Sequence, residues 1–69
     1  MSEQLERGDR KVVKVGENSY RVYAYDGATW QKYRHHFADQ EAVTNYLYDD
    51  RFTPIGTDEH GNLIIRPKD

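Results

Sequence analysis

The first half of the chain alternates apolar and polar residues with the two-residue period of β-strands. A Val-rich run ends at the turn-forming residues 16–19, and a Tyr-rich run ends at Asp26-Gly27, a dipeptide that favours a two-residue hairpin turn. A third alternating run follows this turn. The three strands are expected at residues 11–15, 20–25 and 28–34. Together they predict a three-stranded antiparallel β-meander.

Two-residue turns would fix how these strands pair. The second turn places Tyr23 opposite Trp30, and the first places Val15 opposite Tyr20, with Val13 opposite Val22. One face of the meander then holds Val13, Val15, Tyr20, Val22, Ala24 and Tyr33. The other face holds Val12, Lys14, Arg21, Tyr23, Tyr25, Trp30 and Lys32. A β-bulge in either turn would shift this assignment by one residue.

After residue 38 the apolar residues recur at helical spacing. Asp39 is a good N-cap, because its carboxylate accepts from backbone N–H groups two or three residues further on. The apolar face of this helix is Ala42, Val43, Tyr46 and Leu47. Asp49 and Asp50 would lie unfavourably at the negative end of the helix dipole. We therefore expect the helix to end near Tyr48 or Asp50.

The tail reads as a second hairpin. Its strands are expected at residues 52–57 and 62–66, joined by a turn over residues 58–61. The predicted order is β-β-β-α-β-β, which is an α+β fold whose helix packs on the Val13/Val22 face of a small antiparallel sheet. Residues 11–67 would form this single domain. Residues 1–10 lack periodicity and are expected to form a disordered or loosely attached arm.

Length and composition limit the function classes. A chain of 69 residues has room for one core, so a shallow working surface is expected rather than a deep pocket. Without cysteine, neither disulfides nor a thiolate zinc site can stabilise the fold. No apolar run reaches the length of a signal peptide or a membrane span. We therefore expect a cytoplasmic protein that does not enter a membrane.

The residues that could carry chemistry do not form a recognisable site. His35 and His36 are adjacent and would point apart, and His60 is distant in the chain, so we predict no metal site. Ser2 and Ser19 have no recognisable base partner, and the chain lacks a phosphate-binding glycine loop. We therefore predict no cofactor and no enzymatic activity.

The second face of the meander is the strongest candidate for function. Its predicted binding residues are Lys14, Arg21, Tyr23, Tyr25, Trp30 and Lys32. Tyr, Trp and Arg are enriched at the energetic centres of protein interfaces. We therefore expect a small accessory or inhibitory module that binds a larger protein.

Three alternatives remain open for the same face. Bases of single-stranded RNA or DNA could stack on the rings while the cations follow the phosphates, although the formal net charge of −2 disfavours nucleic acid. A structural homodimer could form through this face or through strand edges. Tyr23 and Trp30 could also merely stabilise the hairpin or lie in the core. The candidate site disappears if the helix packs on Trp30.

Overall fold

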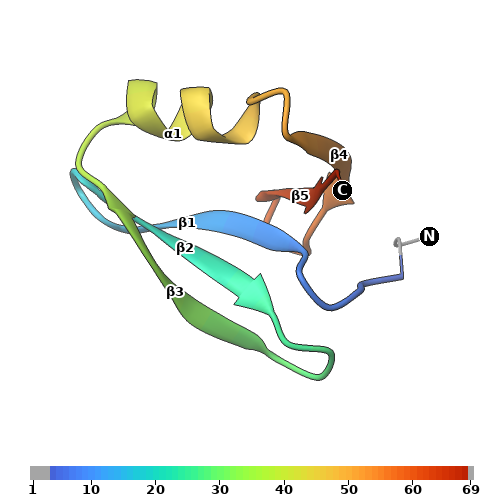
Figure 1. The fold of residues 1–69 in the computed structure, drawn as a ribbon. Coiled ribbons are helices and arrows are strands. Elements are labelled where there is room, and N and C mark those ends of the chain that lie inside the picture. Colours follow the sequence, from blue (N-terminus) through green and yellow to red (C-terminus); the bar gives the residue numbers. More distant parts are fainter. Residues whose placement is uncertain (1–3, 69) are drawn as a thin grey trace.

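The computed structural model describes residues 4–68, which form a small α+β domain. Its elements are β1 (Arg10–Gly16), β2 (Ser19–Tyr25), β3 (Trp30–Phe37), α1 (Gln40–Leu47), β4 (Phe52–Thr57) and β5 (Leu63–Pro67). The strands form one antiparallel sheet in the order β3-β2-β1-β5-β4, with α1 on one side (Figure 1). The predicted fold class and element order are confirmed.

The pairing of β1 with β2 differs from the predicted register by one residue. Val12 lies opposite Val22, and Lys14 lies opposite Tyr20. The turn pairs Gly16 with Ser19 as expected, but the register shifts between Lys14 and Gly16. No non-glycine residue of the described chain has positive φ, so this turn cannot take the type I′ form that matches strand twist, and a bulge accommodates the mismatch.

This shift exchanges the two faces of β1. Val12, predicted on the aromatic side, is buried in the core with Val22. Val13, predicted in the core, pairs with Arg21 and lies on the aromatic side. A bulge of one residue moves each side chain of β1 on the far side of it from the turn to the opposite face of the sheet. The faces predicted for Val12, Val13 and Lys14 were therefore wrong.

The turn after β2 is longer than predicted. Asp26 Oδ1 accepts hydrogen bonds from the N–H groups of Ala28 and Thr29, both at 2.8 Å. This side-chain interaction replaces the two-residue turn with a four-residue loop, so Tyr25 rather than Tyr23 lies opposite Trp30. The register of β2 with β3 thus differs from the predicted one by two residues. Because side chains alternate with a period of two, each residue of these strands still lies on its predicted face.

The helix covers the Val12/Val22 face of the meander. It begins where predicted, because Asp39 Oδ1 accepts from the N–H of Ala42 at 2.8 Å, and it ends at the C-cap Tyr48. Val43 is buried against Val12 and Val22. Tyr20, Tyr33, Phe37, Tyr46 and Leu47 pack around this cluster. Within residues 4–68 no helix is long and apolar enough to cross a membrane.

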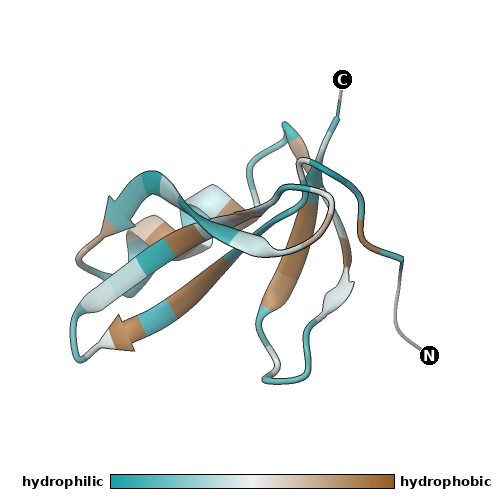
Figure 2. Ribbon diagram, turned by 90° about the horizontal axis from the view of Figure 1, so that it is seen from below, coloured by the Kyte–Doolittle hydropathy of each residue, from teal (hydrophilic) through white to brown (hydrophobic). Residues whose placement is uncertain are grey.

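The second hairpin joins the sheet over a very short segment. β5 pairs with β1 only at Arg10 and Lys11, and beyond Lys11 the two strands diverge. Figures 1 and 2 show the β4–β5 hairpin turned steeply away from the meander, with the apolar stretch of β5 drawn in brown in Figure 2. The sheet is therefore folded into two parts that enclose an angle on the side away from α1.

Part of the predicted N-terminal arm is attached to the sheet. Asp9 is fully buried, and the Gly8 N–H donates to the Tyr25 carbonyl oxygen at 2.9 Å. Arg10 already belongs to β1, and its guanidinium lies 4.6 Å from the centre of the Tyr33 ring. The ordered domain therefore starts before residue 11. Residues 1–3 of the predicted arm lie outside the described residues.

Candidate functional site

Five of the six predicted binding residues share the face that α1 leaves uncovered. Strand pairing puts Tyr23 opposite Lys32 and Tyr25 opposite Trp30. We call this surface the aromatic face; it comprises Lys11, Val13, Arg21, Tyr23, Tyr25, Trp30 and Lys32. Lys14 pairs with Tyr20, so strand alternation puts it on the helix side, although it borders the rim of the aromatic face.

Trp30 is the centre of this face and is half-buried. The Tyr25 ring meets it edge-on, with 5.2 Å between the ring centres. Lys11 Nζ lies 4.6 Å from the centre of the Trp30 ring, close enough for a cation–π interaction. The indole is thus held by a cation and a second ring, and part of its surface stays accessible.

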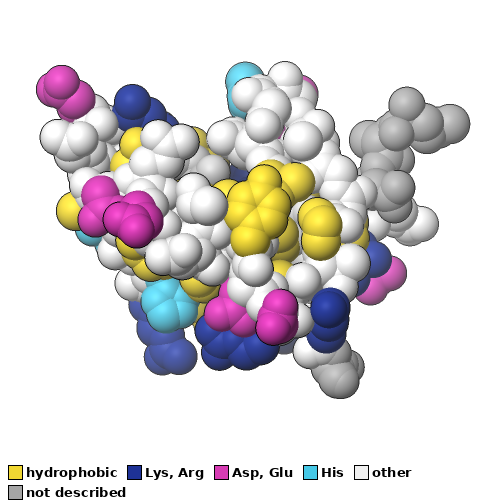
Figure 3. All heavy atoms as spheres, turned by 90° about the horizontal axis from the view of Figure 1, so that it is seen from above, with side chains coloured by type: hydrophobic (Ala, Val, Ile, Leu, Met, Phe, Trp, Pro, Cys, Tyr) yellow, Lys and Arg dark blue, Asp and Glu magenta, His cyan; other side chains and the backbone are white. Residues whose placement is uncertain are grey.

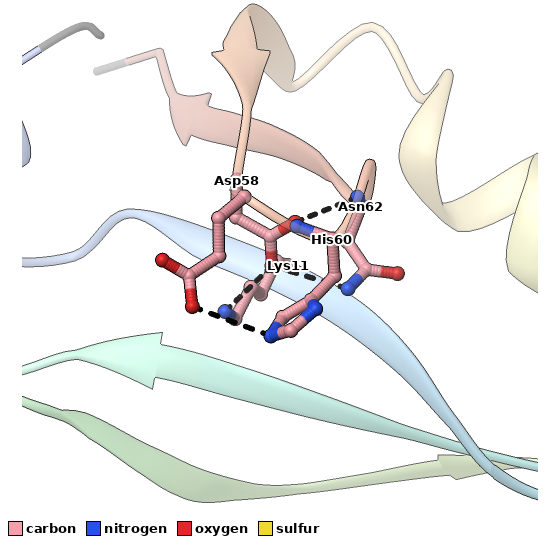
Figure 4. Close-up of polar contacts among 5 residues, drawn as sticks. Lys11, Asp58, His60 and Asn62 are labelled. Atoms are coloured by element: carbon pink, nitrogen blue, oxygen red, sulfur yellow. Dashed lines mark hydrogen bonds and ion pairs between the residues drawn. The ribbon is translucent and has the colours of Figure 1, made fainter.

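Lys11 connects the aromatic face to the turn between β4 and β5. Its Nζ donates to Asp58 Oδ2 at 2.8 Å, and the two side chains are only 13% and 9% exposed (Figure 4). Asp58 also accepts from the N–H groups of His60 and Asn62 and from the Asn62 side-chain amide. The turn is therefore fixed beside Trp30 by one nearly buried carboxylate.

The ionisation of Asp58 follows from these contacts. Burial alone would raise the pKa of its carboxyl. The Lys11 ammonium and the N–H donors of Asn62 and His60 outweigh burial, and they hold the pKa of Asp58 far below its usual range. Asp58 is thus an anion at neutral pH, and Lys11 is its counter-ion.

Two hollows adjoin Trp30 in the angle between the meander and the β4–β5 hairpin. The larger, about 660 Å³, is bordered by Trp30, by Ile64, by Thr57 at the end of β4 and by the turn residues 58–60. The smaller, about 380 Å³, is bordered on the meander side by Lys11, Val13, Lys14, Tyr23 and Trp30, and on the turn side by Asp58, His60 and Asn62. Both are open to solvent, and each is large enough for one or a few side chains of a partner.

The structure also pairs two residues that the sequence left apart. Ser19 Oγ and His36 Nε2 lie 2.7 Å apart on the exposed side of the first turn. Neither of the two hollows beside Trp30 includes them. No group of three His, Asp or Glu side chains within residues 4–68 could hold a metal ion.

Sequence reasoning missed the side of the site that the second hairpin supplies. Asp58, His60 and Lys11 come together only because β5 pairs with β1 at Lys11, a contact across more than fifty residues of chain. The resulting site offers a flat ring, two open hollows and a fixed ion pair. Comparison of the chain with models of known protein families, with curated proteins and with solved structures found no match.

Proposed function

We propose that this protein is a small non-enzymatic binding module that engages a larger protein through its aromatic face. The observation that carries the proposal is the packing of α1 on the opposite face, which leaves Trp30 half-buried beside two open hollows. Tyr23 and Tyr25 extend the ring surface, and Arg21 and Lys32 add cations at its edge. Half-buried rings next to unfilled hollows are typical anchor points of protein interfaces.

Electrostatics favours a protein over a nucleic acid as the partner. Lys11, the cation nearest to Trp30, is already neutralised by Asp58. Glu59 follows in the same turn with its side chain 85% exposed, so it would repel a phosphate placed on the indole. A nucleic-acid site gathers free cations directly at its stacking rings, whereas the cation over the Trp30 ring is already paired with Asp58.

Substitution of the rings tests this function. We expect Trp30→Ala combined with Tyr23→Ala to abolish capture of a protein partner from an extract of the source organism, with circular dichroism verifying the fold. Tyr48→Ala is the matched control, since Tyr48 is 69% exposed and is the C-cap of α1. Figure 3 shows the molecule from the side on which α1 lies. Equal capture by the folded double variant and the unaltered chain would refute the proposal.

The nucleic-acid alternative is tested on the same samples. Fluorescence anisotropy with mixed-sequence single-stranded DNA and RNA at low salt should show no Trp30-dependent binding. Binding that weakens steeply with added salt and disappears in Trp30→Ala would instead assign the aromatic face to nucleic acid.

A further inference from the structure

One edge of β1 is only partly occupied by another strand. β1 pairs with β2 along its length but with β5 only at Arg10 and Lys11, so residues 12–16 have a free side. Figure 2 shows β5 diverging from β1 there. Val12, Val13 and Lys14 keep a regular register before the bulge at the turn. Backbone N–H and C=O groups on such an edge can pair with an added strand.

The other free edges are less suited to an added strand. β3 and β4 end the sheet, so each has an outer edge. β4 contains Pro54, which lacks an N–H group, and its register shifts between Pro54 and Gly56. The pairing of β3 is interrupted opposite the segment between Arg21 and Tyr23. Prolines and irregularities of this kind protect edge strands from pairing.

The free edge of β1 adjoins the smaller hollow. Val13 and Lys14 border this hollow together with the rings of Tyr23 and Trp30. Three regular residues extend only about 10 Å, so backbone pairing alone would bind weakly. A side chain of the added strand that enters the hollow beside Val13 and Trp30 would supply the missing apolar burial.

The charged side chains near this edge indicate the charge of the partner segment. Within residues 4–68, Lys14, Arg21 and Lys32 make no ion pair with a carboxylate, unlike Lys11. A second copy of the chain would bring Lys14 to the same edge as its own Lys14, which is unfavourable. An acidic residue beside the apolar anchor of the segment would pair with Lys14, which borders the smaller hollow, whereas Glu59 borders only the larger one.

We infer that the free edge of β1 accepts an extended acidic segment of the partner protein as an additional β-strand, with one apolar side chain in the hollow beside Trp30. This inference rests on the proposed function and names the partner's chemistry. The added strand would lie between β1 and the β4–β5 turn, where His60 and Asn62 border the same hollow.

A peptide library gives the first test. The probe is a phage-displayed library of random nine-residue peptides, selected on the immobilised full chain. We expect enriched peptides to contain one large apolar residue flanked by Asp or Glu. Selection that yields no enriched peptide, or only basic or proline-rich peptides, would overturn the inference.

Backbone methylation of the best selected peptide then tests strand addition directly. In a β-ladder alternate N–H groups point to the neighbouring strand, so N-methylation at alternate positions should weaken binding about three- to tenfold, while the positions between should matter little. Amide signals of residues 12–14 should shift on peptide addition. A uniform response to methylation would overturn the inference.

The same peptide separates this inference from the proposed function. Peptide binding could be lost in Trp30→Ala while the effect of N-methylation does not alternate along the peptide. This result would support the aromatic face as a binding site but reject strand addition. Trp30-dependent capture of a folded partner when no peptide is enriched would likewise support the proposed function and reject strand addition. A concentration-dependent dimer that protects the amides of residues 12–14 would assign the edge to a second copy, and would also overturn the inference.

Discussion

Asp9 and Arg66 join the two ends of the domain through a paired set of hydrogen bonds. Arg66 Nε donates to Asp9 Oδ1 at 2.8 Å, and Nη2 donates to Oδ2 at 2.9 Å. Asp9 is fully buried, and its Oδ2 also accepts from the Glu6 N–H at 2.9 Å. The carboxylate therefore fixes the segment before β1 to β5.

We expect Asp9→Asn to destabilise the protein by about 2–4 kcal/mol, because it leaves the guanidinium of Arg66 without its main anionic partner. Urea unfolding followed by circular dichroism measures the loss. Glu6→Gln is the matched control, since the Glu6 carboxylate is exposed and lies 3.6 Å from Arg66 Nη1. Its effect should stay below about 1 kcal/mol. Equal stability of both variants would show that the Asp9 contacts contribute little.

Acid should unfold the protein through Asp9 and Asp58. Burial would raise the pKa of both carboxyls, but hydrogen bonds from Arg66 to Asp9, and from Lys11 and Asn62 to Asp58, hold both pKa values below the usual 3.8. Below about pH 4 the unfolded chain therefore binds protons that the folded chain does not. The stability contributed by these groups is present above that pH and is lost as pH falls towards the folded pKa values.

Thermal unfolding between pH 7 and pH 2 tests this expectation. The melting temperature should change little down to about pH 4 and then fall, and Asp58→Asn should flatten the fall. Glu59→Gln, a change in the same turn at an exposed side chain, should leave the profile unchanged. If the melting temperature of Asp58→Asn fell with pH as steeply as that of the unaltered chain, Asp58 would not contribute to acid unfolding.

Local signals predicted most of the elements but not the faces of β1. The N-cap Asp39, the apolar helix face and the Asp58 turn act over a few residues, so the sequence reveals them. The bulge before Gly16 depends on how one short turn matches strand twist, and it reverses Val12 and Val13. The Lys11–Asp58 pair depends on where β5 docks, which no local pattern specifies.

The corrected register of β1 makes a direct prediction about two neighbouring valines. Val12 is 7% exposed in the core with Val22, whereas Val13 borders an open hollow. We expect Val12→Ala to cost about 2–3 kcal/mol and Val13→Ala less than about 1 kcal/mol. Urea unfolding of the two variants under identical conditions compares them. The reverse order would restore the register expected from a turn without a bulge.

Lys11 should control both the stability of the β4–β5 turn and the accessibility of Trp30. We expect Lys11→Met to destabilise the domain by about 2 kcal/mol, since Asp58 would keep its charge in a nearly buried position without its counter-ion. The pKa of Asp58 should rise, which carboxyl-detected NMR titration would record. Acrylamide should also quench Trp30, the chain's only tryptophan, more strongly once the ammonium no longer covers its ring.

Lys32→Met is the matched control for this prediction. Lys32 lies on the same face of the meander but is exposed and forms no ion pair with a carboxylate in residues 4–68. Its removal should change stability by less than about 0.5 kcal/mol and leave the quenching of Trp30 unaltered. If both lysine variants behaved alike, the ion pair would be a surface contact of little energetic consequence, and Trp30 would owe its position to Tyr25 and the strand pairing alone.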